Sequence, residues 1–427
     1  MTWPAIALAL ALLVAARAEA KPPNIVMIIS DDQRWTDFGF MGHPIIQTPN
    51  LDKLASQSLV FPRGYVPSSL CRPSLATLVT GLYAHQHKIT GNEPPIPPGG
   101  KNTPVYRQQR HEMIAYIDKV PLLAKTLGDI GYVSHQSGKW WEGHYSRGGF
   151  TAGMTQGFPN PGGRHGDEGL RIGREGMQPM FDFLDSAGDK PFFVYYAPFL
   201  PHTPHNPPER LLSKYQNKTD SLFVAKYWAM CDWFDESCGE LLDYLDKKDL
   251  TDDTIVLFVT DNGWIQKPHA RGYAPKSKRS PYDGGVRTPI MVRWPGTVKP
   301  SRVETPVIST DLVPTVLAAC GLEPSAEMQG VNLLDEEKVN GRKAIFGEIF
   351  GHNAVDIHRP AANLHYRWCI EGNWKLIVPN KANIADGVEE LYDLSEDPHE
   401  EKNLAAECPD RVEKMKRMVD RWWGVES

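Results

Sequence analysis

The chain has 427 residues, more than the roughly 250–300 that one hydrophobic core usually serves, so we expect one large domain and a smaller one. Hydrophobic residues make up 41 % and charged residues 23 %, which is ordinary globular usage and excludes a disordered chain. The net charge is only −6 and no long basic run occurs, which argues against nucleic acid as a partner.

The first twenty residues resemble a signal peptide. An apolar stretch over residues 5–15 is too short to span a bilayer, and Ala18-Glu19-Ala20 fits the small-x-small pattern of a cleavage site. We therefore predict a signal peptide over residues 1–20, a secreted or periplasmic mature protein, and no membrane span after cleavage. The alternative is an N-terminus that tethers the protein to a membrane.

Periodicity along the chain predicts strands that alternate with helices. Continuous runs rich in Ile, Val and Phe predict buried strands at residues 24–30, 191–197, 254–260 and 286–294. Amphipathic patterns predict helices at residues 48–58, 121–130 and 223–247. Segments rich in Pro and Gly predict surface loops at residues 94–110 and 151–174. The alternation predicts a large, doubly wound, mostly parallel α/β sheet flanked by helices.

The pattern changes near residue 343. The segments IFGEIF, HYRWCIEG and NWKLIVP predict short antiparallel strands, and residues 408–423 predict an amphipathic closing helix. We therefore expect a large α/β domain over residues 21–342 and a small α+β domain, with a short antiparallel sheet and a helix, over residues 343–427.

Two acidic pairs follow two of the predicted strands. Asp31 and Asp32 follow the first strand, and Asp261 and Asn262 follow the strand at residues 254–260. Sites in open α/β sheets form at the carboxyl ends of strands, where oxygen ligands without thiolate favour calcium or magnesium. Either pair alone could be a helix or turn cap, but the two together predict a metal site.

Cys71 stands two residues before Pro73, and proline is favoured in the first turn of a helix. Cys71 is therefore predicted to lie at a helix N-terminus, where an anion such as sulfate or phosphate is stabilised. The alternative is an ordinary buried cysteine. Two further cysteines, Cys231 and Cys238, share one predicted helix roughly 10 Å apart, too far for a disulfide bond.

The segment CRPSLATLVTG resembles the signature of the formylglycine-dependent sulfatases of the alkaline phosphatase superfamily, C-x-P-S-R followed by apolar residues and T-G. The segments PNIVMIISDDQ, TPNLDKLA, TDNG, YDGGVRTP, WPG and ELYDLSEDPHEEKNLA occur in the order of that family. The resemblance implies that a formylglycine-generating enzyme oxidises Cys71 and that the hydrated aldehyde attacks the sulfur of a sulfate ester.

The resemblance also implies the site residues. One Ca²⁺ would be held by Asp31, Asp32, Asp261, Asn262 and the modified Cys71. Lys139, His202 and Lys278 match sulfate-binding and acid/base positions, in keeping with charge neutralisation by lysine and proton transfer by histidine.

Two positions depart from the family pattern. The signature arginine is replaced by Leu75, and our hypothesis is that Arg72, one helical turn away, takes over part of its catalytic role. The family segment GKWHLG reads GKWWEG here, so Trp141 replaces a histidine. His144 is a candidate to compensate, and Trp141 is a candidate wall for sugar stacking.

These features predict a secreted sulfatase acting on a sulfated carbohydrate. Two alternatives remain open: a phosphodiesterase or phosphonate hydrolase of the same superfamily, and a non-catalytic protein that binds sulfated glycans. Candidate contacts for the leaving group are His269, Arg271, His358 and Arg359.

Overall fold

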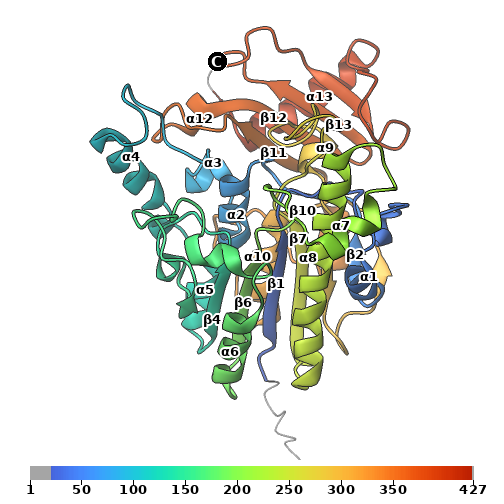
Figure 1. Ribbon diagram of the computed structural model, residues 1–427. Coiled ribbons are helices and arrows are strands. Elements are labelled where there is room, and N and C mark those ends of the chain that lie inside the picture. The colour runs from blue at the N-terminus through green and yellow to red at the C-terminus, as the bar shows by residue number, and fades with distance from the viewer. Residues whose placement is uncertain (1–20, 426–427) are drawn as a thin grey trace, which may run out of the picture.

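A large sheet of eight strands forms the centre of the computed structural model, which describes residues 21–425 (Figure 1). The signal peptide predicted over residues 1–20 lies outside the described residues. The strand order is β5-β4-β6-β1-β7-β8-β2-β9. The strands are β1 (Asn24–Ser30), β2 (Leu59–Phe61), β4 (Val133–Gly138), β5 (Ala152–Gly153), β6 (Phe192–Ala197), β7 (Thr254–Thr260), β8 (Ile290–Arg293) and β9 (Ser301–Arg302).

The sheet is mostly parallel, as predicted. Strand β1 pairs in parallel with β6 and β7, and β4 pairs in parallel with β5 and β6. The exception is β8, which runs antiparallel to β7 and β2. A separate two-stranded parallel sheet joins β3 (Gly64–Tyr65) to β10 (Val307–Ile308).

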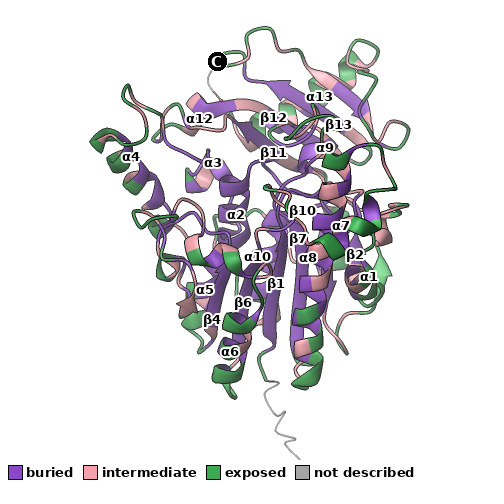
Figure 2. Ribbon diagram, in the orientation of Figure 1, coloured by how far each residue is buried: buried purple, intermediate pink, exposed green. Residues whose placement is uncertain are grey.

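Strand β1 is buried along its whole length because both faces of the sheet are covered (Figure 2). Ile25, Met27 and Ile29 belong to one hydrophobic core, whereas Val26 and Ile28 belong to another. Side chains alternate between the faces of a strand, so this continuous apolar run supplies two cores at once.

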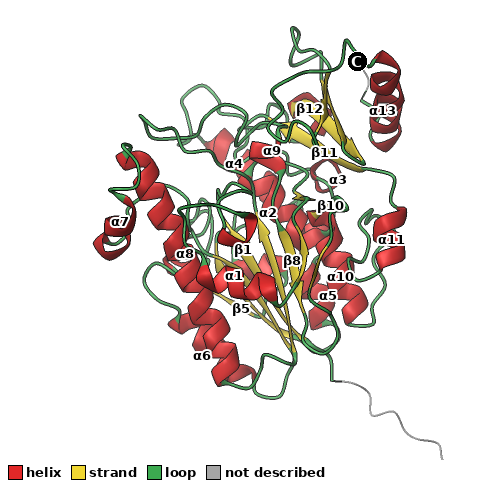
Figure 3. Cartoon of the chain, turned by 90° about the vertical axis from the view of Figure 1, so that its right-hand side faces the viewer, coloured by secondary structure: helices red, strands yellow, loops and turns green. Residues whose placement is uncertain are grey.

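Helices pack on both faces of the sheet (Figure 3). The first core includes side chains of α2 (Cys71–Thr80), α5 (Leu123–Gly128) and α10 (Leu312–Ala319). The second core includes α1 (Pro49–Ser56), α6 (Gln178–Ala187) and α8 (Leu222–Lys247). The doubly wound architecture is thereby confirmed. The shorter helices are α3 (Ala84–His87), α7 (Glu209–Tyr215), α9 (Asp283–Val286), α11 (Glu336–Gly341) and α12 (Pro360–Asn363). Val286 of α9 and Val339 of α11 also belong to the first core.

The loop expected over residues 94–110 is only partly a loop, because α4 (Pro104–Ile114) begins inside it. Thr103 caps this helix by accepting a hydrogen bond of 3.3 Å from the backbone N–H of Tyr106. Pro104 occupies the first helical position, which proline favours. The proline that suggested a loop therefore starts a helix.

A four-stranded antiparallel sheet with the order β11-β12-β13-β14 follows the main sheet in the chain. Its strands are β11 (Ile345–Phe350), β12 (Leu364–Glu371), β13 (Trp374–Pro379) and β14 (Glu390–Asp393), the last of which was not predicted. Cys369 and Leu376 pack against α13 (Pro409–Trp422), while Trp368 and Ile377 belong to the core of the large sheet. One hydrophobic core thus continues across residues 342–343.

No helix within residues 21–425 is long and apolar enough to cross a membrane.

All six cysteines are unpaired, and Cys231 and Cys238 lie on α8 as predicted.

Candidate active site

The Asp31–Asp32 and Asp261–Asn262 pairs lie side by side because β1 and β7 are adjacent parallel strands. Asp31 and Asp32 directly follow β1, and Asp261 and Asn262 directly follow β7. The backbone N–H of Asp32 donates to Asp261 Oδ1 at 3.0 Å, and Asn262 Nδ2 donates to Asp32 Oδ1 at 2.7 Å. Asp32 takes a left-handed backbone conformation with φ of 63°. The carboxyl ends of two strands therefore build one cluster of oxygen atoms.

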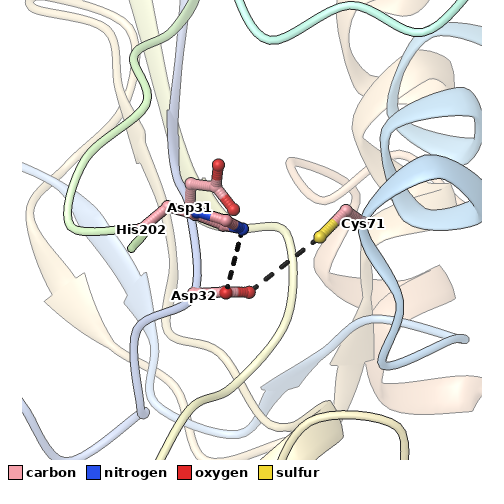
Figure 4. Close-up of side chains that lie close together, drawn as sticks. All are labelled: Asp31, Asp32, Cys71 and His202. Atoms are coloured by element: carbon pink, nitrogen blue, oxygen red, sulfur yellow. Dashed lines mark hydrogen bonds and ion pairs between the residues drawn. The ribbon is translucent and has the colours of Figure 1, made fainter. Parts of the chain in front are cut away.

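Cys71 faces this cluster from the first residue of α2 (Figure 4). Its Sγ lies 4.0 Å from Asp32 Oδ1, and its side chain is almost completely buried. His202 approaches Asp32 from the loop after β6, with 3.4 Å between Nε2 and Oδ2. His202 Nδ1 lies 2.6 Å from the backbone oxygen of Thr203, so we assign the Nδ1 proton to that hydrogen bond and leave Nε2 toward Asp32. Both predicted residues lie in the site.

Two lysines complete the cluster. Lys139, directly after β4, donates to both carboxylate oxygens of Asp31 at 2.8 Å. Lys278 donates to Asp32 at 2.5 and 2.8 Å and reaches Cys71 Sγ at 2.9 Å. Both lysines are buried, and buried charges require such partners.

Burial dominates the electrostatics of the site. Burial alone would lower the pKa of Lys139 and of Lys278, but the facing carboxylates raise both values, so the two ammonium groups stay charged. Burial, reinforced by these two positive charges, lowers the pKa of His202 well below its ordinary value. Burial also raises the pKa of Cys71 to about 12, so an unmodified Cys71 is a thiol at neutral pH.

The oxygen cluster fits a hard divalent cation. Asp261 Oδ2 and Asn262 Oδ1 are buried and have no hydrogen-bond partner, which is costly unless another group satisfies them. Asp31, Asp32, Cys71 and His202 also place ligand atoms within 4.8 Å of one another. Carboxylate and amide oxygens suit calcium or magnesium.

A cavity of about 270 Å³ opens onto Cys71, Lys139, His202 and Lys278. Sequence reasoning missed several residues of its wall, which come from loops without a recognisable motif: Asn92, Arg164, His165, Trp264, Tyr273, Arg279 and His352. Arg164 is positioned by an ion pair with the buried Glu93. None of the four predicted leaving-group contacts, His269, Arg271, His358 and Arg359, is among the lining residues of this cavity.

Arg72 is fully buried but points to a different partner. Its Nε and Nη2 donate to the two carboxylate oxygens of Glu142 at 2.7 and 2.6 Å. The pair connects the first turn of α2 to the segment GKWWEG, and Leu75 lies in the hydrophobic core. Arg72 therefore lies one residue from Cys71 and is held by Glu142.

Trp141 lines the cavity, yet only 3 % of its surface is exposed. The Arg164 guanidinium lies 4.8 Å from its ring centroid, and the His165 ring lies 5.2 Å away. This packing leaves little ring surface for a sugar. His144 caps a turn by accepting from the N–H of Ser146 and is not a cavity residue, so His165 is the imidazole that lies beside Trp141.

The sequence and the fold are similar to those of known hydrolases. The sulfatase family model matches residues 23–322, and a model described as the C-terminal region of N-sulphoglucosamine sulphohydrolase matches residues 273–422. Human N-acetylgalactosamine-6-sulfatase is 29 % identical over 366 residues, covering 75 % of this chain and 67 % of that protein. Human arylsulfatase A is 28 % identical over 480 aligned positions, covering 95 % of this chain and 89 % of that protein.

The crystal structure of Ps i-CgsB is also similar, with a TM-score of 0.71 and 25 % identity over 95 % of this chain and 94 % of that one. The protein is therefore an ester hydrolase of the alkaline phosphatase superfamily. Within that class, the chain belongs to the sulfatase family, and its activity is the hydrolysis of sulfate esters.

Proposed function

We propose that the protein hydrolyses a sulfate ester of a carbohydrate, with a formylglycine derived from Cys71 and one Ca²⁺ held by Asp31, Asp32, Asp261 and Asn262. The observation that carries this proposal is the position of Cys71 at the head of α2, with Lys278 Nζ at 2.9 Å and Asp32 Oδ1 at 4.0 Å. Support for a carbohydrate comes from the name of the human relative, which acts on N-acetylgalactosamine 6-sulfate.

The chain's own groups suit a sulfuryl substrate. Lys139 and Lys278 bring two permanent positive charges to the cavity, where they neutralise charge on the sulfuryl oxygens. Trp141 Nε1 and His165 Nδ1 are buried without partners in the wall, and both can donate to an oxygen of the substrate.

The leaving alcohol needs a proton. His202 is the candidate acid/base group: Thr203 engages its Nδ1 proton and fixes the ring, and Nε2, which carries no proton in the neutral ring, must first accept one before it can pass it to the leaving oxygen. A Ca²⁺ held by Asp31, Asp32, Asp261 and Asn262 would supply a Lewis acid, and a formylglycine hydrate at position 71 would supply the nucleophilic hydroxyl.

Maturation and localisation belong to the same proposal. A formylglycine-generating enzyme would convert Cys71 despite Leu75 at the signature position. The apolar stretch and small-residue site within residues 1–20 support export to a secreted or periplasmic location.

The test combines one chemical and two kinetic measurements on protein from the native host. Mass spectrometry of the peptide around residue 71 should show a loss of about 18 Da relative to the cysteine form, the difference between CH₂SH and CHO. The same preparation is assayed with an aryl sulfate and an aryl phosphodiester, and a Cys71→Ala variant serves as the control.

We expect the modified peptide, sulfate-ester hydrolysis and loss of that activity in the control. An intact thiol in active protein would contradict formylglycine. Faster cleavage of the phosphodiester would favour a phosphodiesterase or phosphonate hydrolase. Binding of sulfated glycans without either activity in modified protein would favour a non-catalytic glycan-binding role.

A further inference from the structure

A second cavity adjoins the one that contains Cys71. Its volume is about 510 Å³, larger than the 270 Å³ of the catalytic cavity. Thr203 and Trp264 line both cavities, so the two cavities are neighbours that share a wall. The second cavity is thus placed to receive whatever is attached to the reacting ester.

The start of α8 forms part of this cavity because of the topology. A helix that precedes a parallel strand begins at the carboxyl edge of the sheet, and α8 precedes β7 (Figure 1). The first two residues of α8, Leu222 and Phe223, are 56 % and 37 % exposed. Exposed large apolar side chains beside a reaction site indicate a binding surface, and apolar surfaces pack against the C–H face of a sugar ring.

Two cations line the same cavity without an acidic partner. Lys226 lies one helical turn after Leu222, and Arg271 lies in the loop that follows β7. No carboxylate in residues 21–425 forms an ion pair with either side chain. Two other cations near α8 do have acidic partners, because Lys214 pairs with Asp232 and Arg210 pairs with Glu236.

We propose that this second cavity binds an anionic sugar unit that neighbours the sulfated unit in the same glycan, with Lys226 and Arg271 recognising its carboxylate or sulfate. The inference rests on the proposed carbohydrate substrate and adds its class, an acidic oligosaccharide. Charge complementarity and the wall shared with the catalytic cavity support an occupant that carries a second negative charge beside an apolar ring face.

The test compares matched substrates on the mature enzyme. N-acetylgalactosamine 6-sulfate is presented alone, linked to neutral galactose, linked to glucuronic acid and linked to galactose sulfate. The wild type should show a KM about tenfold lower or more for the two acidic disaccharides than for the neutral one, as expected for hydrogen bonds to charged groups. The two acidic substrates distinguish carboxylate from sulfate recognition.

The variant Lys226→Gln with Arg271→Gln should lose this preference. The readout is the ratio of the KM values for the neutral and the acidic disaccharides within each protein, so a general loss of activity in the double variant does not count as support. Lys218→Gln removes an exposed charge nearby, outside the lining of the cavity, and should leave the preference intact.

Equal KM values for neutral and acidic disaccharides in wild type, or a preference that survives in the double variant, would overturn the inference. Binding of the acidic disaccharides to the Cys71→Ala protein, measured by calorimetry, tests the second cavity independently of sulfate release. It therefore distinguishes failure of this inference from failure of the proposed function. Tight binding that needs Lys226 and Arg271 supports the second cavity even if no sulfate is released, and absence of binding contradicts it.

Discussion

Lys278 bridges Asp32 and Cys71, with its Nζ 2.5 Å from Asp32 Oδ1 and 2.9 Å from Cys71 Sγ. The two partners come from different parts of the fold, since Asp32 follows β1 and Cys71 begins α2. The lysine itself lies in the loop before α9. One ammonium group therefore fixes the distance between the acidic cluster and the nucleophile position.

This bridge predicts a kinetic effect for Lys278→Ala. We expect kcat/KM for an aryl sulfate to fall by about 100-fold or more, because a fixed positive charge beside the sulfuryl oxygens is lost. Lys267→Ala, an exposed lysine of the same long loop, is the matched control and should stay near wild type. Circular dichroism and the mass of the peptide around residue 71 verify that both variants are folded and matured. Near-normal activity of Lys278→Ala would remove this lysine from the reaction.

Metal removal should lower the melting temperature. A cation at 100 times its Kd stabilises the native state by about 2.7 kcal/mol, so chelation should cost several degrees and added Ca²⁺ should restore them. Asp261→Asn weakens the oxygen cluster and should abolish this calcium response. Asp253→Asn, an exposed residue just before the opposite end of β7, should retain it. An equal response of all three proteins would place the calcium elsewhere.

The buried pair of Arg72 and Glu142 predicts a strong coupling. Arg72→Met or Glu142→Leu alone leaves one charge buried without its partner, at a cost of about 3–5 kcal/mol in unfolding free energy. The double variant should cost less than the sum of the two single variants, which denaturant unfolding of all four proteins measures. Additive losses would mean that the pair contributes nothing as a unit.

The same variants test whether Arg72 also serves maturation or catalysis. If Arg72 takes over part of the role of the missing signature arginine, Arg72→Met should reduce modification of Cys71 or turnover more than Glu142→Leu does. Equal effects of the two variants would leave Arg72 with a structural role only.

The oxygen cluster at the ends of β1 and β7 could be predicted from sequence because its geometry follows from the sheet. The strands at residues 24–30 and 254–260 are long apolar runs that are recognisable in the sequence. Once they pair in parallel, Asp31 must lie next to Asp261. The start of the antiparallel strand β8 and of the helix at Pro104 was harder to predict from sequence. Proline occurs both in loops and at the ends of helices and strands, so Pro104 and Pro289 do not by themselves distinguish the two.

The cavity wall could not be predicted. Arg164 is held by Glu93, 71 positions away, and His165 packs on Trp141 from a glycine-rich loop. Such contacts depend on how long loops fold over the sheet, and neither spacing nor periodicity encodes that path. The imidazole that lies beside Trp141 is that of His165, whereas proximity in sequence suggested His144.

A buried histidine outside the active site should make the free energy of unfolding depend on pH. His135 lies in β4, is 4 % exposed and packs against Phe183 with 5.1 Å between ring centroids. Burial lowers its pKa to about 4, and its Nδ1 has no partner. Below pH 6.5, His135 binds a proton in the unfolded chain but stays neutral in the folded chain. The free energy of unfolding therefore falls as the pH drops from about 6.5 to about 4.

Replacing this ring with phenyl should therefore make the protein less sensitive to acid. Between pH 7.5 and 4.5, we expect His135→Phe to lose about 1–3 kcal/mol less unfolding free energy than wild type, measured by urea denaturation in one buffer series. The slope will not vanish, because burial also lowers the pKa of His87 to about 3. His269→Phe, at an exposed position, should follow the wild-type curve. A His135→Phe curve parallel to wild type would show that His135 is protonated in the folded protein.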